Sequence, residues 1–124
     1  VTKTLPQLAG KFDGLSVRVP TPVVSLSDVT ALLRRSVTVE EVNDAFRKAA
    51  NDSFYQGILA VSEEPLVSRD FIGNPHSGIV DLPLTKVVDG NLIKVMVWYD
   101  NEWGYSNRLV ELVADVGHYL QKEQ

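Results

Sequence analysis

Apolar and polar residues alternate in two segments near the start of the chain. In residues 15–19 apolar side chains alternate with Ser16 and Arg18, which is the period-two pattern of a β-strand. The prolines at positions 20 and 22 interrupt this pattern, and a stretch rich in β-branched residues resumes it over residues 23–33. We therefore expect strands over 15–19 and 23–33, with a bend between them.

A helix is predicted immediately afterwards. Thr38 and Glu41 have the spacing of a capping box, in which the hydroxyl and the carboxylate each satisfy a backbone donor at a helix start. The apolar residues that follow recur at helical spacing: Val42, Ala45, Phe46 and Ala49. This pattern indicates an amphipathic helix that packs one face against a core.

The middle of the chain has the composition of short strands and turns. We expect strands over 58–61 and 66–71, separated by a polar connection, and a turn over residues 73–76. Residues 79–99 are interpreted as two strands joined through Asp89-Gly90, because both turn positions of such a hairpin must tolerate positive φ. Nearly every position of 92–99 except Lys94 is apolar, so this strand is expected to be covered on both faces.

The last segment predicts a long helix. Asp100 or Asn101 can cap its start, and an apolar stripe follows at helical spacing: Leu109, Leu112, Val113, Val116 and Leu120. We therefore expect an α+β fold with a largely antiparallel mixed sheet, helices on one face and a long C-terminal helix. Residues 1–101 would form one unit, and residues 102–124 the terminal helix.

Composition narrows the classes of function. The chain has 124 residues and a net charge of −4, and its basic residues are dispersed, which argues against nucleic acid as the main partner. It contains no cysteine, so disulfides, thiolate metal sites and a cysteine nucleophile are excluded within this sequence. No apolar run approaches the length of about 20 residues that a membrane span needs, and no signal peptide is recognisable, so we expect a cytoplasmic location.

Residue patterns alone identify no catalytic residue and no metal site. There is no Gly-x-Gly-x-x-Gly, which would mark a dinucleotide-binding domain. His76 and His118 have no second ligand at metal spacing, so solvated surface histidines are the simpler interpretation. No serine has a histidine and an acid that local sequence would place beside it. Arg18 fits either a solvent-exposed strand arginine or a phosphate ligand, since a guanidinium matches a phosphate with two parallel hydrogen bonds.

The least generic stretch is residues 98–106, Trp-Tyr-Asp-Asn-Glu-Trp-Gly-Tyr-Ser. Such a cluster at a strand-to-helix junction fits two interpretations. It can lock the terminal helix onto the sheet, or it can form a corner in which an amide side chain binds an amide-bearing ligand.

This stretch closely resembles the signature before the last helix of the glyceraldehyde-3-phosphate dehydrogenase family. Further matches occur in the same order at residues 18–22, 40–43, 57–59, 64–68 and 79–81, so the resemblance covers nearly the whole chain. It implies a tetrameric cytosolic enzyme that oxidises glyceraldehyde 3-phosphate to 1,3-bisphosphoglycerate with NAD or NADP and inorganic phosphate. The implied fold is the later part of the catalytic domain, with a terminal helix that packs against the dinucleotide-binding domain.

The resemblance also implies residue roles. Arg18 matches the arginine that binds substrate or inorganic phosphate, Asn101 the asparagine that holds the nicotinamide carboxamide, and Tyr105 the tyrosine near that ring. The family's nucleophilic cysteine, histidine base and dinucleotide-binding domain have no counterparts in this sequence. The isolated chain is therefore expected to be inactive without the missing N-terminal half, and its choice between NAD and NADP is not readable here.

Alternatives remain open. The sequence departs from common family members at Val23, where many have Asn, and at Gly78, where Ser or Thr is usual. Tyr99 and Tyr105 favour the glyceraldehyde enzyme over erythrose-4-phosphate dehydrogenase, which usually has Cys and often Phe there. Two competing hypotheses come from other classes of function: a non-catalytic module that self-associates, and an independent phosphate-binding domain that uses Arg18. A homo-oligomer is expected both for the self-associating module and for the complete enzyme.

Overall fold

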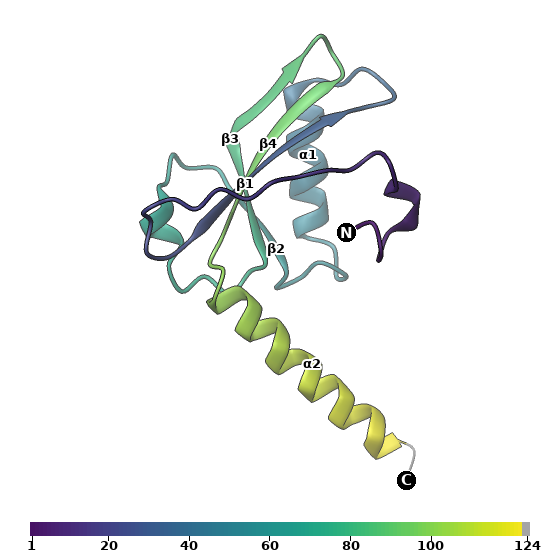
Figure 1. Ribbon diagram of the computed structural model, residues 1–124, viewed down its shortest axis with the longest axis vertical. Helices are drawn as coiled ribbons and strands as arrows, with labels where there is room; N and C mark the ends of the chain where they lie inside the picture. The colour runs from purple at the N-terminus through teal and green to yellow at the C-terminus, as the bar shows by residue number, and fades with distance from the viewer. Residues whose placement is uncertain (123–124) are drawn as a thin grey trace.

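A computed structural model of the chain describes residues 1–122 and shows an α+β fold, as predicted (Figure 1). Four strands form one mixed sheet in the order β1-β4-β3-β2. β1 pairs antiparallel with β4, β4 antiparallel with β3, and β3 parallel with β2. The elements are η1 (Pro6–Leu8), β1 (Ser25–Leu32), α1 (Val39–Ala50), β2 (Leu59–Ser62), η2 (Ser68–Phe71), β3 (Gly78–Val88), β4 (Leu92–Tyr99) and α2 (Trp103–Lys122), where η denotes a 3₁₀-helix.

The β3–β4 hairpin turns as the sequence predicts. Asp89 and Gly90 have φ values of 49° and 74°, and Val88 pairs with Leu92 across the turn. Three residues lie between this pair, and the first two of them, Asp89 and Gly90, occupy the left-handed region as predicted. Farther along, the pairing shifts register between Asp81 and Lys86, which is a bulge or irregularity in β3.

Helix α1 begins with the predicted capping box. The backbone N–H of Glu41 donates to the Thr38 hydroxyl at 3.1 Å, and the Glu41 carboxylate accepts from the backbone N–H of Thr38 at 2.8 Å. The apolar face of α1 then packs Val42 and Phe46 against one face of the sheet. The buried sheet residues of this cluster are Val80, Leu82 and Val95.

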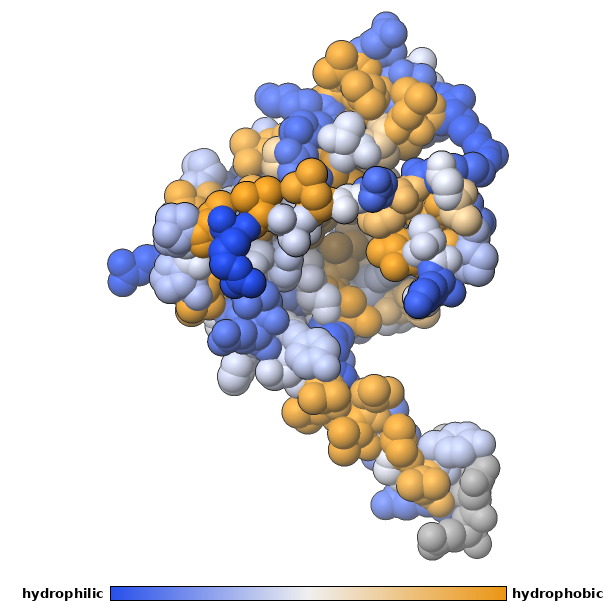
Figure 2. Space-filling model, viewed as in Figure 1, coloured by the Kyte–Doolittle hydropathy of each residue, from blue (hydrophilic) through white to orange (hydrophobic). Residues whose placement is uncertain are grey.

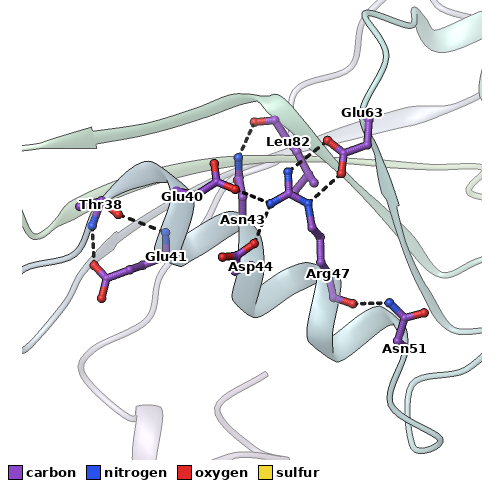
Figure 3. Close-up of polar contacts among 9 residues, drawn as sticks. All are labelled: Thr38, Glu40, Glu41, Asn43, Asp44, Arg47, Asn51, Glu63 and Leu82. Carbon is purple, nitrogen blue, oxygen red and sulfur yellow. Dashed lines mark hydrogen bonds and ion pairs between the residues drawn. The ribbon is translucent and has the colours of Figure 1, made fainter.

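Arg47 ties α1 to the end of β2 (Figure 3). Its guanidinium donates to Glu63, which follows β2, at 2.8 Å, and to Glu40 and Asp44 on its own helix at 2.7 and 2.8 Å. These hydrogen bonds, the one to Glu63 first, raise the pKa of Arg47. Deeper in the same contact the Asn43 amide donates to the Leu82 carbonyl at 3.3 Å, which links α1 to β3.

A second apolar cluster lies on the opposite face of the sheet. Ile79 and Trp98 are paired neighbours there, since side chains alternate between faces along β3 and β4. The Phe71 ring stacks on Trp98 with ring centroids 5.4 Å apart, and the Trp98 indole N–H donates to the Asp81 carboxylate at 2.9 Å. Val24 is buried in this cluster with φ at 73°, a conformation that a β-branched residue rarely adopts. β1 therefore begins at Ser25, two residues later than predicted.

Two predicted strands are absent from the described residues. Residues 12–19 form no helix or strand, and Leu15 is 86% exposed, because no strand of the sheet pairs with this segment. The prediction for 66–71 is also wrong, since Ser68–Phe71 is a 3₁₀-helix. The Asp70 carboxylate accepts from the backbone N–H of Val67 at 2.9 Å, and this local bond satisfies a donor that a strand would have paired with a neighbour.

The two long helices relate to the sheet differently. α1 covers one face, as predicted, whereas α2 leaves the end of β4 and extends away from the sheet (Figure 1). The prediction that β4 is covered on both faces holds in part: Val95 packs in the cluster under α1 and Trp98 in the opposite cluster, but Val95 is the one fully buried residue of the strand. The predicted terminal helix is confirmed as far as Lys122, and residues 123–124 of that prediction lie outside the described residues. Within residues 1–122, neither helix has the length and hydrophobicity needed to cross a membrane.

Candidate functional site at the β4–α2 corner

A pocket of about 260 Å³ lies where β4 passes into α2. Two residues predicted from the sequence to bind cofactor, Asn101 and Tyr105, line this pocket together. The remaining lining residues are Ser77, Tyr99, Asp100, Gly104 and Arg108. Seven residues from the end of β4, the residues that follow it, the start of α2 and the loop before β3 therefore converge on one corner.

Asp100 fixes the backbone of this corner. It is 4% exposed, and one carboxylate oxygen accepts from the backbone N–H groups of Glu102 and Trp103 at 3.1 and 2.9 Å. The other oxygen accepts from the N–H of Gly73 at 2.9 Å, so the same side chain caps α2 and holds the loop at residue 73. These bonds, the one from Trp103 first, lower the pKa of Asp100 despite burial. Of the two predicted caps, Asp100 is the one that the structure uses.

Asn101 lies directly after this anchor and faces the pocket. Its side-chain oxygen accepts from the Ser25 hydroxyl at 3.5 Å, which is the long limit of a hydrogen bond. Within residues 1–122 its amide nitrogen makes no hydrogen bond. A primary amide both donates and accepts, so Asn101 is chemically suited to bind a second amide.

Tyr105 stands one helical turn beyond Asn101, on the first turn of α2, and is 68% exposed. The residue before it, Gly104, lies so close to the preceding loop that an added Cβ would be 2.9 Å from the His76 carbonyl oxygen. Glycine is thus required for the helix start to approach this loop. Its place in the first turn of a predicted helix was the sequence signal that a close contact occurs there.

Arg108 closes the pocket from the helix side. Its Nη1 donates to the Gly57 carbonyl at 2.9 Å, to the Ser77 hydroxyl at 3.3 Å and to the Pro75 carbonyl at 3.4 Å. Nε donates to Glu111 at 2.7 Å, and this pairing lowers the pKa of Glu111. Sequence reasoning missed Arg108, because its partners on the two loops lie 31 to 51 residues away along the chain.

The other candidate residues lie elsewhere. Arg18 is in the exposed segment without regular structure and does not line the pocket, so the structure does not bring it to Asn101 and Tyr105. His76 contacts the Asn74 side chain at 2.8 Å through Nδ1, and His118 is exposed on α2. Residues 1–122 contain no group of three side chains that could hold a metal ion. A second pocket, of about 370 Å³, is mainly an apolar hollow between α1 and the end of β1.

The chain is similar to known proteins over nearly its whole length. The family model described as the C-terminal domain of glyceraldehyde 3-phosphate dehydrogenase matches residues 1–101. The glyceraldehyde-3-phosphate dehydrogenase of Geobacillus stearothermophilus is 54% identical over 114 residues, which cover 92% of this chain and 34% of the relative. Its namesake in Streptomyces coelicolor is 52% identical, over 94% of this chain and 34% of the relative, and that of Zymomonas mobilis 48% identical, over 97% and 36%.

This chain therefore spans about a third of the length of these relatives. The family model covers most of it, and apart from Ser77 the residues of the β4–α2 corner lie near the end of that match or beyond it. The chain belongs to the glyceraldehyde-3-phosphate dehydrogenase family, as the C-terminal part of such a protein.

Proposed function

We propose that this chain is the C-terminal part of an enzyme that oxidises glyceraldehyde 3-phosphate to 1,3-bisphosphoglycerate with inorganic phosphate and NAD or NADP. Residues 1–101 would belong to the catalytic domain and residues 102–124 to its terminal helix. The observation that carries the proposal is the β4–α2 corner, where Asn101 and Tyr105 line one pocket. Family membership supports it independently.

The residues of the corner fit the nicotinamide end of the cofactor. The free amide nitrogen of Asn101 would donate to the oxygen of the nicotinamide carboxamide, and this contact would fix which face of the ring meets the substrate. Tyr105 would lie near the same ring. When bound, the cofactor supplies the hydride acceptor, while these side chains orient it.

Arg18 is proposed to bind the phosphate of the substrate or inorganic phosphate. Its guanidinium offers two parallel donors to a phosphate, which explains the choice of arginine over lysine. In the structure Arg18 is exposed and lies in a segment with no strand partner. We infer that this segment pairs with the N-terminal half of the complete enzyme, and that this pairing brings Arg18 to the substrate.

This sequence contains no cysteine and hence no thiol nucleophile. We propose that the chain alone is inactive and that catalysis requires the N-terminal half, in a cytoplasmic homo-oligomer. The nucleophile and the histidine base would both come from that half.

A hybrid enzyme tests the proposal. This chain would replace the matching 114 residues of the Geobacillus stearothermophilus relative, and reduction of NAD would be followed with glyceraldehyde 3-phosphate and phosphate. We expect an active hybrid, because the replaced and replacing segments are 54% identical. Arg18→Ala should lower kcat/KM for phosphate or substrate, and Asn101→Ala that for NAD, each by about tenfold to a hundredfold, the range for lost charge-assisted or buried hydrogen bonds.

Matched variants control for nonspecific damage. Arg34→Ala and Gln56→Ala remove an arginine and an amide from exposed positions outside the corner and should leave both constants unchanged. A hybrid that folds and assembles, as judged by circular dichroism and sedimentation, but lacks activity would contradict the proposal. So would an active hybrid in which neither Arg18→Ala nor Asn101→Ala changes any constant.

A second candidate function is a non-catalytic module that self-associates. The observation that favours it is the apolar stripe of α2, which is exposed along the helix (Figure 2). Exposed patches of this kind favour association, because burying them removes apolar surface from water. The intact mass of the natural polypeptide distinguishes the two candidates: a mass near 13.7 kDa would favour the module. A mass more than twice that would favour the enzyme.

A further inference from the structure

The start of α2 is held by three different contacts, and the contact made by Arg108 is the farthest along the helix. Asp100 anchors the residues before the helix, and Gly104 packs on the His76 carbonyl. Arg108 lies one turn farther along and reaches back to Gly57 and Ser77. The helix beyond this point extends away from the sheet, so Arg108 is the last of the three contacts that hold its direction (Figure 1).

The chemistry of the contact is specific to arginine. One edge of the guanidinium, Nη1, donates to acceptors on the two loops at Gly57 and at Pro75 and Ser77. The other edge, Nε and Nη2, faces both carboxylate oxygens of Glu111. A planar fork with five donors can serve both sides at once, whereas the single ammonium of a lysine cannot. The Arg108 side chain is 23% exposed, whereas its partner Glu111 is 56% exposed, so the guanidinium is more buried than the carboxylate that it binds.

We propose that Arg108 is a positioning residue for the cofactor pocket. It holds the first turn of α2 against the loops at residues 57 and 75–77, and thereby sets where Tyr105 lies relative to Asn101. Asn101 precedes the helix and is fixed through its neighbour Asp100, while Tyr105 is carried by the helix itself. Loss of Arg108 therefore keeps the Asp100 hydrogen bonds to the start of α2 but lets the helix change its direction. Such a change moves Tyr105 away from Asn101. The ligand in this inference rests on the proposed function.

The conservative variant Arg108→Lys tests this role in the hybrid enzyme. It keeps the charge and loses the fork, and we expect the KM for NAD to rise about tenfold, the equivalent of one charge-assisted hydrogen bond. The KM for phosphate should stay unchanged, because Arg18 lies outside the pocket. A purely structural role would instead change both KM values and the amount of folded enzyme. Arg69→Lys, at an exposed position away from the corner, is the matched control and should change nothing.

Hydrogen exchange on the chain itself tests the same role without catalysis. The backbone N–H groups of Gly104 and Ser106 donate to Asp100 and Glu102 at 3.0 Å and report the first turn of α2. We expect Arg108→Lys to speed their exchange about tenfold, while protection of β3 and β4 stays the same. Unchanged exchange, or an unchanged KM for NAD in an active hybrid, would overturn the inference. A hybrid that is inactive with Arg108 present would overturn the proposed function instead, and the exchange measurement would then decide the positioning role alone.

Discussion

Asp100 accepts three backbone hydrogen bonds at the β4–α2 corner and makes no ion pair there. A carboxylate in this position accepts hydrogen bonds from the free N–H groups at a helix start, and the positive end of the helix dipole stabilises its negative charge. The same side chain reaches Gly73, so the loop and the helix share one anchor. Asp100 therefore determines the position of the neighbouring residue Asn101.

We expect Asp100→Asn to destabilise the chain by roughly 1.5–3 kcal/mol, the range for a lost hydrogen bond to a charged group. The amide has one acceptor oxygen, so it cannot serve both Gly73 and the start of α2. Urea unfolding, followed by circular dichroism, measures the difference. Asp115→Asn, on the exposed part of α2, is the control, and equal stability of the two variants would contradict the role assigned to Asp100.

The effect should depend on pH with a definite sign. Because the folded pKa of Asp100 lies below its ordinary value of 3.8, its contribution is fully present above pH 3.8. The contribution is lost as the pH falls through the folded pKa. The stability difference between the parent chain and Asp100→Asn should therefore be constant near neutral pH and shrink below 3.8. A difference that grows on acidification would refute the assignment.

At the residue scale the sequence predicted part of the site. Asn101 and Tyr105 could be singled out because the signature is contiguous, and the structure brings them into one pocket. Their binding roles stay predictions. The role of Arg108 and the identity of the residue that Gly104 contacts, His76, could not be predicted, since both depend on loops that approach the helix only after folding.

Among the elements, α1 shows how local signals determine a helix. The capping box, the acidic first turn and the basic last turn all favour the same helix, and its apolar face packs on the sheet. Strands were harder to predict. Residues 15–19 alternate perfectly but have no partner strand, and Asp70 turns residues 68–71 into a 3₁₀-helix through a local hydrogen bond. A strand is stable only beside a neighbouring strand that forms hydrogen bonds with it, and the alternation pattern of one segment does not show whether such a neighbour exists.

Removing the capping hydroxyl should weaken α1. We expect Thr38→Ala to lower the free energy of unfolding by about 1 kcal/mol, since the backbone N–H of Glu41 loses its acceptor. Lys48→Ala, an exposed position of the same helix with no ion pair among the described residues, is the control and should stay within about 0.5 kcal/mol of the parent. Chemical denaturation measures both. A Thr38→Ala variant as stable as the parent would mean that tertiary packing alone maintains the helix start.

For the whole molecule, the main feature is that the sheet is compact while α2 projects from it. The space-filling view shows apolar side chains along the projecting helix (Figure 2). The stripe predicted from the sequence is thus confirmed in position, and each of its residues is exposed in this chain: Leu109, Leu112, Val113, Val116 and Leu120. In water an exposed apolar stripe of this kind favours association with another apolar surface.

We expect the isolated chain to self-associate through this stripe. Leu112→Glu places a charge in the stripe and should shift the chain toward monomer, because burying an unpaired charge is unfavourable. Ala114→Glu, at an exposed position on the other side of α2, adds the same charge and should leave association unchanged. Sedimentation velocity over a range of concentrations gives the mass distribution. A parent chain that is a monodisperse monomer at high concentration would contradict the prediction.

The strand order has a consequence for how the chain folds during its synthesis. β4 is the last of the four strands along the chain, yet it lies between β1 and β3 in the sheet. Until the ribosome has released β4, β1 has no neighbour, and β3 has only the short β2. The nascent chain must therefore keep these strands from pairing with other chains during the interval between the release of β1 and that of β4, and this is the stage at which a chaperone that binds extended apolar segments would have the greatest effect on yield.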